Sequence, residues 1–222
     1  MSMSKEIGIN VPEIDLIQTK DGLVHYAIKR FDRQDGKKFH LHTLASMEHI
    51  NFNIPAHYSY LNALKLTNFL TNDYFQIEEF FRRMVFNVIG RNQDDHAKNF
   101  SFIMDEDGYW DLAPAYDITY AFGKGYTKEH QMTINGKTDN IELQDLYLIA
   151  DKIGISRNKV NEIVEQIGDK FLEFPKRAKE LEINNNLIQK IEKNIRWHIP
   201  KSIPKKIILR ENKIVFPKRR KL

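Results

Sequence analysis

A wide apolar stripe near the middle of the chain constrains the fold more than any other feature. Its members recur at the spacing of one helix face: Ile77, Phe80, Phe81, Met84, Val85 and Val88. Side chains this large must be covered by other elements before the chain can fold. The stripe therefore predicts a buried helix that ends at Gly90 and around which the rest of the chain packs.

Shorter patterns on either side predict the remaining elements. Helices are expected over 61–70, over 142–153 up to Gly154, from a Ser156 N-cap to about Phe171, and over 186–198, with Pro175 ending or kinking the third. Two hairpins are expected, one from 13–18 and 23–29 and one from 100–104 and 109–112. Residues 33–56 carry no clear pattern, and 123–140 has the composition of a loop. The predicted fold class is α+β and mainly α-helical, with short hairpins.

Composition excludes several kinds of site. The chain has no cysteine, so disulfides, thiolate metal sites and cysteine nucleophiles are excluded. No stretch approaches the roughly 18 consecutive apolar residues of a membrane span, and the start lacks the basic and apolar regions of a signal peptide. We therefore expect a cytoplasmic location and no membrane partner.

Charge is unevenly distributed along the chain. Residues 201–222 hold nine Lys or Arg and one Glu, about +8, so the other 200 residues carry about −4 of the net +4. The basic tail is suited to contact nucleic acid or an acidic partner, and equally to be a solvated terminus.

The polar stretch that follows the apolar helix carries the chemistry. Asp94 and Asn99 have the spacing D-x-x-x-x-N, the one occurrence in the chain, and Asp117 follows after the 100–112 hairpin. Phosphoryl transfer needs a carboxylate that accepts the proton of the attacking hydroxyl, and oxygen ligands for Mg²⁺. The order of helix, Asp loop, hairpin and second Asp is that of protein kinases.

Other interpretations of these residues stay open at this point. Asp94 and Asp95 can simply cap a turn, and Phe31 can be a core residue. Arg30, Asp32 and Arg33 can form a surface ion-pair network. A metal-dependent hydrolase using Asp94, Asp95, His96 and Asp117 is a further hypothesis, weakened by the scarcity of histidines at metal-binding spacing.

Two strings carry a specific resemblance. DDHAKNFSF and LAPAYDI resemble the catalytic loop and the metal-binding segment of HipA-type serine/threonine protein kinases, the toxins of bacterial type II toxin–antitoxin systems. The similarity extends to IGINVPE, KRFDR and HQMTINGK, and reaches about Trp197. It implies the C-terminal, large lobe of a protein-kinase-like fold.

The resemblance also implies roles for single residues. Asp94 would be the catalytic base, and Asn99 and Asp117 would bind Mg²⁺. The ATP site would be formed by Lys29, Arg30, Phe31, His96, Ala97, Lys98, Asn99, Tyr116 and Asp117.

The resemblance divides the chain into three parts. Residues 1–28 would be a remnant of the upstream lobe, and 201–222 a basic tail. Between them, 29–200 would form the C-terminal lobe, with a hinge at 29–33, a catalytic loop at 91–99 and a metal segment at 113–119. The phosphate-binding loop and the strand lysine of a kinase would precede the hinge, and they are absent. We expect this chain alone to bind ATP weakly and to phosphorylate little.

Partners follow from the same resemblance. It implies a protein substrate, with an aminoacyl-tRNA synthetase as the family's target class, and an antitoxin. A separate N-terminal lobe is a further candidate, with DNA reached indirectly or through the basic tail. The alternative function is a non-catalytic toxin–antitoxin interaction module that contributes to DNA binding.

Overall fold

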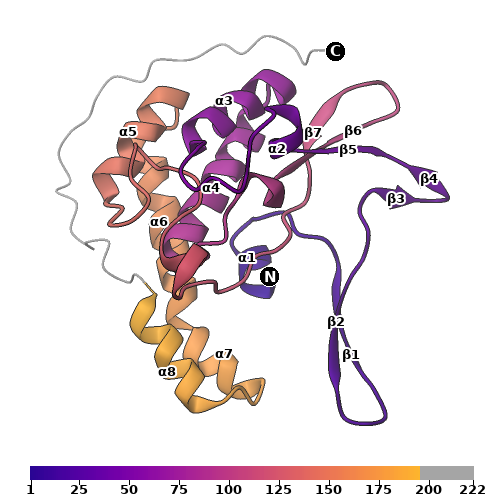
Figure 1. Cartoon of the computed structure of the whole chain (residues 1–222), viewed down its shortest axis with the longest axis vertical. Helices are drawn as coiled ribbons and strands as arrows, with labels where there is room; N and C mark the ends of the chain where they lie inside the picture. The colour runs from indigo at the N-terminus through magenta and orange to yellow at the C-terminus, as the bar shows by residue number, and fades with distance from the viewer. Residues whose placement is uncertain (196–222) are drawn as a thin grey trace.

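The computed structural model describes residues 1–195, which form a helical body with small antiparallel sheets (Figure 1). The helices are α1 (Ser2–Glu6), α2 (Leu44–Met47), α3 (Tyr60–Thr71), α4 (Tyr74–Gly90), α5 (Leu143–Ile153), α6 (Arg157–Leu172), α7 (Phe174–Glu180) and α8 (Asn185–Asn194), with 3₁₀ turns η1 (Ala97–Asn99) and η2 (Gly125–Lys128). The strands are β1 (Ile14–Gln18), β2 (Val24–Ile28), β3 (Arg33–Gln34), β4 (Lys37–Lys38), β5 (His40–Thr43), β6 (Ser101–Met104) and β7 (Trp110–Leu112).

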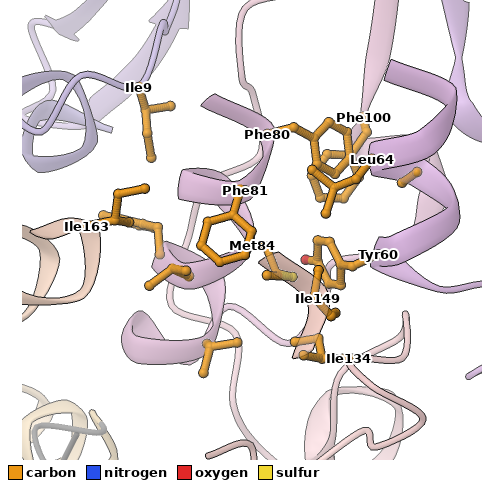
Figure 2. Packing of buried hydrophobic residues seen from close by; sticks show 14 of the residues in the cluster. Ile9, Tyr60, Leu64, Phe80, Phe81, Met84, Phe100, Ile134, Ile149 and Ile163 are labelled. Atoms are coloured by element: carbon orange, nitrogen blue, oxygen red, sulfur yellow. The ribbon is translucent and has the colours of Figure 1, made fainter. Parts of the chain in front are cut away.

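Helix α4 lies at the centre of the core, as its apolar stripe predicts. Phe80, Phe81, Met84 and Val85 are fully buried, and α3 and α6 pack on α4. Figure 2 shows Phe80, Phe81 and Met84 among residues from α3, α5 and α6 and from the segments around Ile9 and Ile134. Full burial of each such side chain stabilises the fold by about 1.5–3 kcal/mol, so α4 fixes the position of whatever follows it.

Helix α4 ends at Gly90, as predicted. The residue in the left-handed conformation, however, is Arg91, with φ of 55°. Gly90 is needed for a different reason. A Cβ atom there would lie 2.5 Å from Cζ of Phe171, so the glycine lets α6 approach α4.

The other predicted helices are present with small shifts at their ends. The hydroxyl of Ser156 accepts a hydrogen bond from the amide of Lys159 and caps α6, and Gly154 ends α5. Helix α6 stops at Leu172, and Pro175 lies in the first turn of α7, where its missing amide costs nothing. Helix α8 covers most of the expected 186–198; residues 196–198 and the tail at 201–222 lie outside the described residues.

The second hairpin is part of a larger sheet than predicted. Strands β6 and β7 pair as expected, and β5 adds to β6 with His42 opposite Phe102. The short elements α2, β3 and β4 were not predicted either. No helix within 1–195 is long and apolar enough to cross a bilayer.

The first hairpin projects away from the helical body (Figure 1). Strands β1 and β2 pair only with each other, in a register that places Ile14 opposite Ile28 and Leu16 opposite Tyr26. These four residues and Val24 therefore share one apolar face. The relative exposure of each of the five lies between 39% and 59%, so the face is uncovered.

The segment before this hairpin packs on the helical body. Ile7 and Ile9 are buried in the core. Glu6 accepts hydrogen bonds from Arg177 at 2.6 Å and from Lys170 at 2.9 Å, and these partners lower the pKa of its carboxyl to about 2. A boundary at residue 28 stays a prediction.

The close approach of α4 and α6 gives a test with a built-in control. Gly90→Ala is expected to destabilise the protein by about 1–3 kcal/mol because its methyl group overlaps the Phe171 ring. Gly168→Ala, in α6 with open space around it, is expected to stabilise the protein by about 0.5–1 kcal/mol through helix propensity. Urea unfolding of the two variants measures both effects, and a stabilising Gly90→Ala would contradict this account.

Candidate functional site

The loop after α4 and the segment after β7 lie side by side. The amide of Gln93 donates to the carbonyl of Ala121 at 3.0 Å, and the amide of Ala121 donates to the carbonyl of Arg91 at 3.1 Å. The Tyr116 hydroxyl donates to the carbonyl of Lys98 at 2.7 Å. These bonds bring the predicted catalytic loop and metal segment together.

Asp94 and Asn99 are linked within the catalytic loop. The Asn99 amide nitrogen donates to the backbone carbonyl of Asp94 at 2.8 Å, which leaves the Asn99 amide oxygen available as a ligand. The Asp94 side chain is 47% exposed, and its Oδ1 atom lies 3.7 Å from Nε2 of His96. A carboxylate so placed can accept a proton from an incoming hydroxyl group.

Asp117 has a strained backbone and a free side chain. Its φ of 56° lies in the left-handed region, which a non-glycine residue adopts at a cost of about 1–3 kcal/mol. Its carboxylate is exposed and makes no hydrogen bond or ion pair within residues 1–195. Its backbone carbonyl accepts a hydrogen bond from the side chain of Asn92 at 3.4 Å.

The predicted hinge meets this site through one aromatic ring. Phe31 stacks on Tyr116, with ring centroids 6.0 Å apart and planes 24° apart. The side chains of Lys29 and Arg30 form ion pairs instead, Lys29 with Glu13 at 3.0 Å and Arg30 with Asp32 at 2.6 Å. The surface ion-pair interpretation therefore describes the Arg30 side chain.

Asp95 points away from its neighbour Asp94 and into the protein. Its carboxylate, 1% exposed, accepts hydrogen bonds from the Tyr60 hydroxyl at 2.6 Å, from Nδ1 of His130 at 2.7 Å and from the amide of Gln131 at 2.7 Å. Three donors satisfy a buried carboxylate without a metal ion. Asp95 therefore attaches the catalytic loop to the core.

The remaining predicted residues of the loop contact Phe52 or lie in the core. The Lys98 ammonium lies 4.2 Å from the centre of the Phe52 ring, and no ion pair joins it to the aspartates among the described residues. Ala97 is buried in η1, and His96 precedes that turn beside Phe52. Within 1–195 no three His, Asp or Glu side chains are grouped to hold a metal ion.

A small cavity lies between the predicted catalytic loop and the predicted metal segment. Two of the residues that line it were not found by the sequence patterns. Asn99, Tyr116 and Asp117 line it together with Asn87 and Asn92. The Oδ1 atom of Asn92 is buried there without a hydrogen-bond partner among the described residues. The one sequence signal for these two asparagines is their polarity, inside and just after an otherwise apolar helix.

Arg83 is a second residue that sequence patterns did not find. Its guanidinium is buried in the middle of α4, where it pairs with Glu79 and donates to the carbonyl of Ala113 at 2.9 Å. The same Glu79 accepts from the amide of Asn10 at 3.0 Å. Arg83 thus ties the start of the metal segment and the N-terminal segment to the central helix.

Comparison with known proteins identifies the family. The model of the HipA-like C-terminal domain matches residues 1–173. This chain belongs to that family. Its similarity to a Haemophilus influenzae protein named "Putative kinase" is 27% identity over 204 residues, 85% of this chain and 55% of that protein. A Sinorhizobium fredii protein named "Putative kinase Y4dM" is 30% identical over 135 residues, 53% of this chain and 32% of that protein.

A solved structure shows the same fold. A chain in the complex of HipA, HipB and operator DNA from Shewanella oneidensis superposes with a TM-score of 0.68 at 17% identity. The match covers 89% of this chain and 52% of that one. The predicted resemblance and fold class are confirmed. The chain spans about half the length of the relatives it matches.

The contrast between the two adjacent aspartates can be measured directly. Asp95→Ala leaves three buried donors without an acceptor and is expected to destabilise the fold by about 3 kcal/mol or more. Asp94→Ala, at a half-exposed position, is expected to change stability by no more than about 0.5 kcal/mol. Chemical denaturation of the pair tests this, and equal losses would show that Asp95 is not the anchor.

Proposed function

We propose that this chain is the C-terminal lobe of a serine/threonine protein kinase of the HipA type. The observation that carries the proposal is that Asn99 and Asp117 line one cavity and that the Asn99 side chain is hydrogen-bonded to the backbone of Asp94, whose carboxylate is half-exposed. Membership in the HipA-like family and the kinase names of two relatives support it.

The donor set suits Mg²⁺ carried by ATP. Magnesium prefers oxygen ligands and is commonly bound by one or two protein groups together with phosphate oxygens. The Asp117 carboxylate and the Asn99 amide oxygen meet that description, and the partnerless Asn92 Oδ1 adds a third oxygen in the same cavity. When bound, the ion would neutralise charge that develops on the phosphates.

The residues of this chain would then act by positioning and proton transfer. Asp94 accepts the proton of a serine or threonine hydroxyl as its oxygen forms a bond to the γ-phosphorus. The bond between that phosphorus and the bridging oxygen breaks, and ADP leaves with the electron pair. Phe31, stacked on Tyr116, offers an aromatic surface at the edge of the site for the purine.

The proposal includes partners. The exposed apolar face of β1 and β2 suits a strand-bearing lobe that lies over it, because a two-stranded hairpin is marginally stable alone. The relatives are about twice as long as the region they share with this chain, which leaves room for such a lobe. An antitoxin partner is supported by the Shewanella complex with HipB. An aminoacyl-tRNA synthetase as the substrate and a cytoplasmic location stay predictions from the resemblance.

A second candidate is a non-catalytic toxin–antitoxin interaction module. It is favoured by one observation, the uncovered apolar hairpin, which offers a binding surface without requiring catalysis. Contact with DNA through the basic tail concerns residues outside the described part of the chain.

Nucleotide binding separates the two candidates. Mg·ATP titrated into the chain by calorimetry is expected to bind weakly but saturably, and Asp117→Ala to weaken binding about tenfold or more. Asp94→Ala is the matched control: it should keep the nucleotide and lose only transfer. Absence of saturable binding, both by the chain alone and with an added upstream lobe, would favour the interaction module.

The hairpin gives an independent prediction. Leu16→Thr with Val24→Thr is expected to leave the unfolding free energy of the chain within about 0.5 kcal/mol, because both side chains are already exposed. The same pair should weaken binding of a lobe made from the part of the Haemophilus influenzae relative that this chain does not match. Hydrogen exchange across 14–28 with and without that lobe reports the contact. A large loss of stability in the chain alone would contradict this role.

A further inference from the structure

A continuous series of hydrogen bonds, buried except for the last, runs from Asp95 to the backbone of Asp117. The Tyr60 hydroxyl donates to Asp95 at 2.6 Å and accepts from the Asn87 amide nitrogen at 3.1 Å. The Asn87 amide oxygen accepts from the Asn92 amide nitrogen at 3.1 Å, and that nitrogen also approaches the Asp117 carbonyl at 3.4 Å. All five residues except Asp117 are buried.

The direction of every bond in this series is set by the carboxylate at its start. Asp95 can only accept, so the Tyr60 hydroxyl must donate to it. Burial, reinforced by the Asp95 charge, raises the pKa of Tyr60 well above its usual value, which keeps that proton in place.

The remaining bonds follow from that one. Because the Tyr60 oxygen can then only accept from Asn87, the Asn87 amide must turn its nitrogen toward Tyr60 and its oxygen toward Asn92. Asn92 must in turn use its nitrogen for Asn87 and Asp117. This arrangement leaves the Asn92 amide oxygen without a donor, and that oxygen is buried with no hydrogen-bond partner among the described residues.

We propose that Asp95, Tyr60, Asn87 and Asn92 act as positioning residues that hold Asp117 in its strained conformation and turn the Asn92 oxygen toward the cation site. This inference rests on the proposed function for its cation. The restraint on the Asp117 backbone does not depend on any ligand.

The geometry explains why such a restraint is needed. Asp117 has a positive φ, its side chain has no hydrogen bond or ion pair among the described residues, and its neighbours at 113–116 are held by other contacts. A strained conformation persists only where surrounding contacts over-determine it. The Asn92 nitrogen supplies the side-chain contact that reaches the Asp117 backbone itself.

The test compares two tyrosines that lose the same atom. Tyr60→Phe removes the hydroxyl that sets the direction of the series and keeps the ring in the core. Tyr147→Phe removes a hydroxyl bonded to Asn161 at 2.5 Å, between α5 and α6, and serves as the control. Asn92→Ala removes the far end of the series.

Two readouts are made on the full chain. Hydrogen exchange of the 113–120 peptide, without any ligand, is expected to be about tenfold faster in Tyr60→Phe and Asn92→Ala and unchanged in Tyr147→Phe. Calorimetry with Mn²⁺ and ADP is expected to show binding about three- to tenfold weaker in the first two variants only, the range that one hydrogen bond supplies. The double variant should be no worse than Asn92→Ala, because both changes interrupt one series.

The outcomes separate this inference from the proposed function. If the parent chain binds no Mn·ADP while exchange responds as expected, the restraint holds and the cation site fails. Equal exchange in Tyr60→Phe and Tyr147→Phe would overturn the inference, whatever the nucleotide does. Additive losses in the double variant would also overturn it, since they would mean two independent effects.

Discussion

The burial of helix α4 is the constraint on which the rest of the structure depends. Its apolar side chains leave no freedom to rotate or slide, because α3 and α6 pack on it and a methyl group at Gly90 would already collide with Phe171. The loop that follows therefore starts from a fixed point in a fixed direction. Asp94 can be half-exposed and still well positioned because the helix before it cannot move.

Hydrogen bonds from polar groups around the loop hold the segments of the site in one arrangement. Arg83 binds the carbonyl of Ala113, Asp95 binds three donors beneath the loop, and the Tyr116 hydroxyl binds the carbonyl of Lys98. The first two join a segment of the site to the core, and the third joins the two segments of the site to each other. Because a buried polar group without its partner costs about 1–3 kcal/mol, the segments have a strong preference for this one arrangement.

Sequence patterns found the features of the site that lie within one short stretch of the chain. They missed the contacts between residues that are far apart in the sequence. The helix stripe and the D-x-x-x-x-N spacing are local, and both could be read directly. Phe31 was placed near the purine site by resemblance alone, and in the fold its ring stacks on Tyr116. Asn87 and Asn92 could not be assigned, because their roles depend on a hydroxyl from Tyr60, which precedes them by 27 residues or more. Strand β5 was missed for a similar reason: its partner β6 lies about sixty residues further along the chain.

Charge balance supports the cation of the proposed function. Asp94 and Asp117 present two carboxylates, and the basic side chains nearest in sequence are engaged elsewhere. Arg91 pairs with Asp139 and Lys98 lies over Phe52, so among residues 1–195 only His96 approaches either carboxylate, at 3.7 Å from Asp94. Adding a polyphosphate to two unpaired carboxylates would be strongly repulsive. Under the proposed function, a divalent ion would remove that repulsion at the Asp117 end, and a lysine from a lobe seated on the β1–β2 hairpin would do so over the phosphates. Metal, nucleotide and upstream lobe would then bind in mutual dependence, and weak nucleotide binding by this chain alone would follow from its charge.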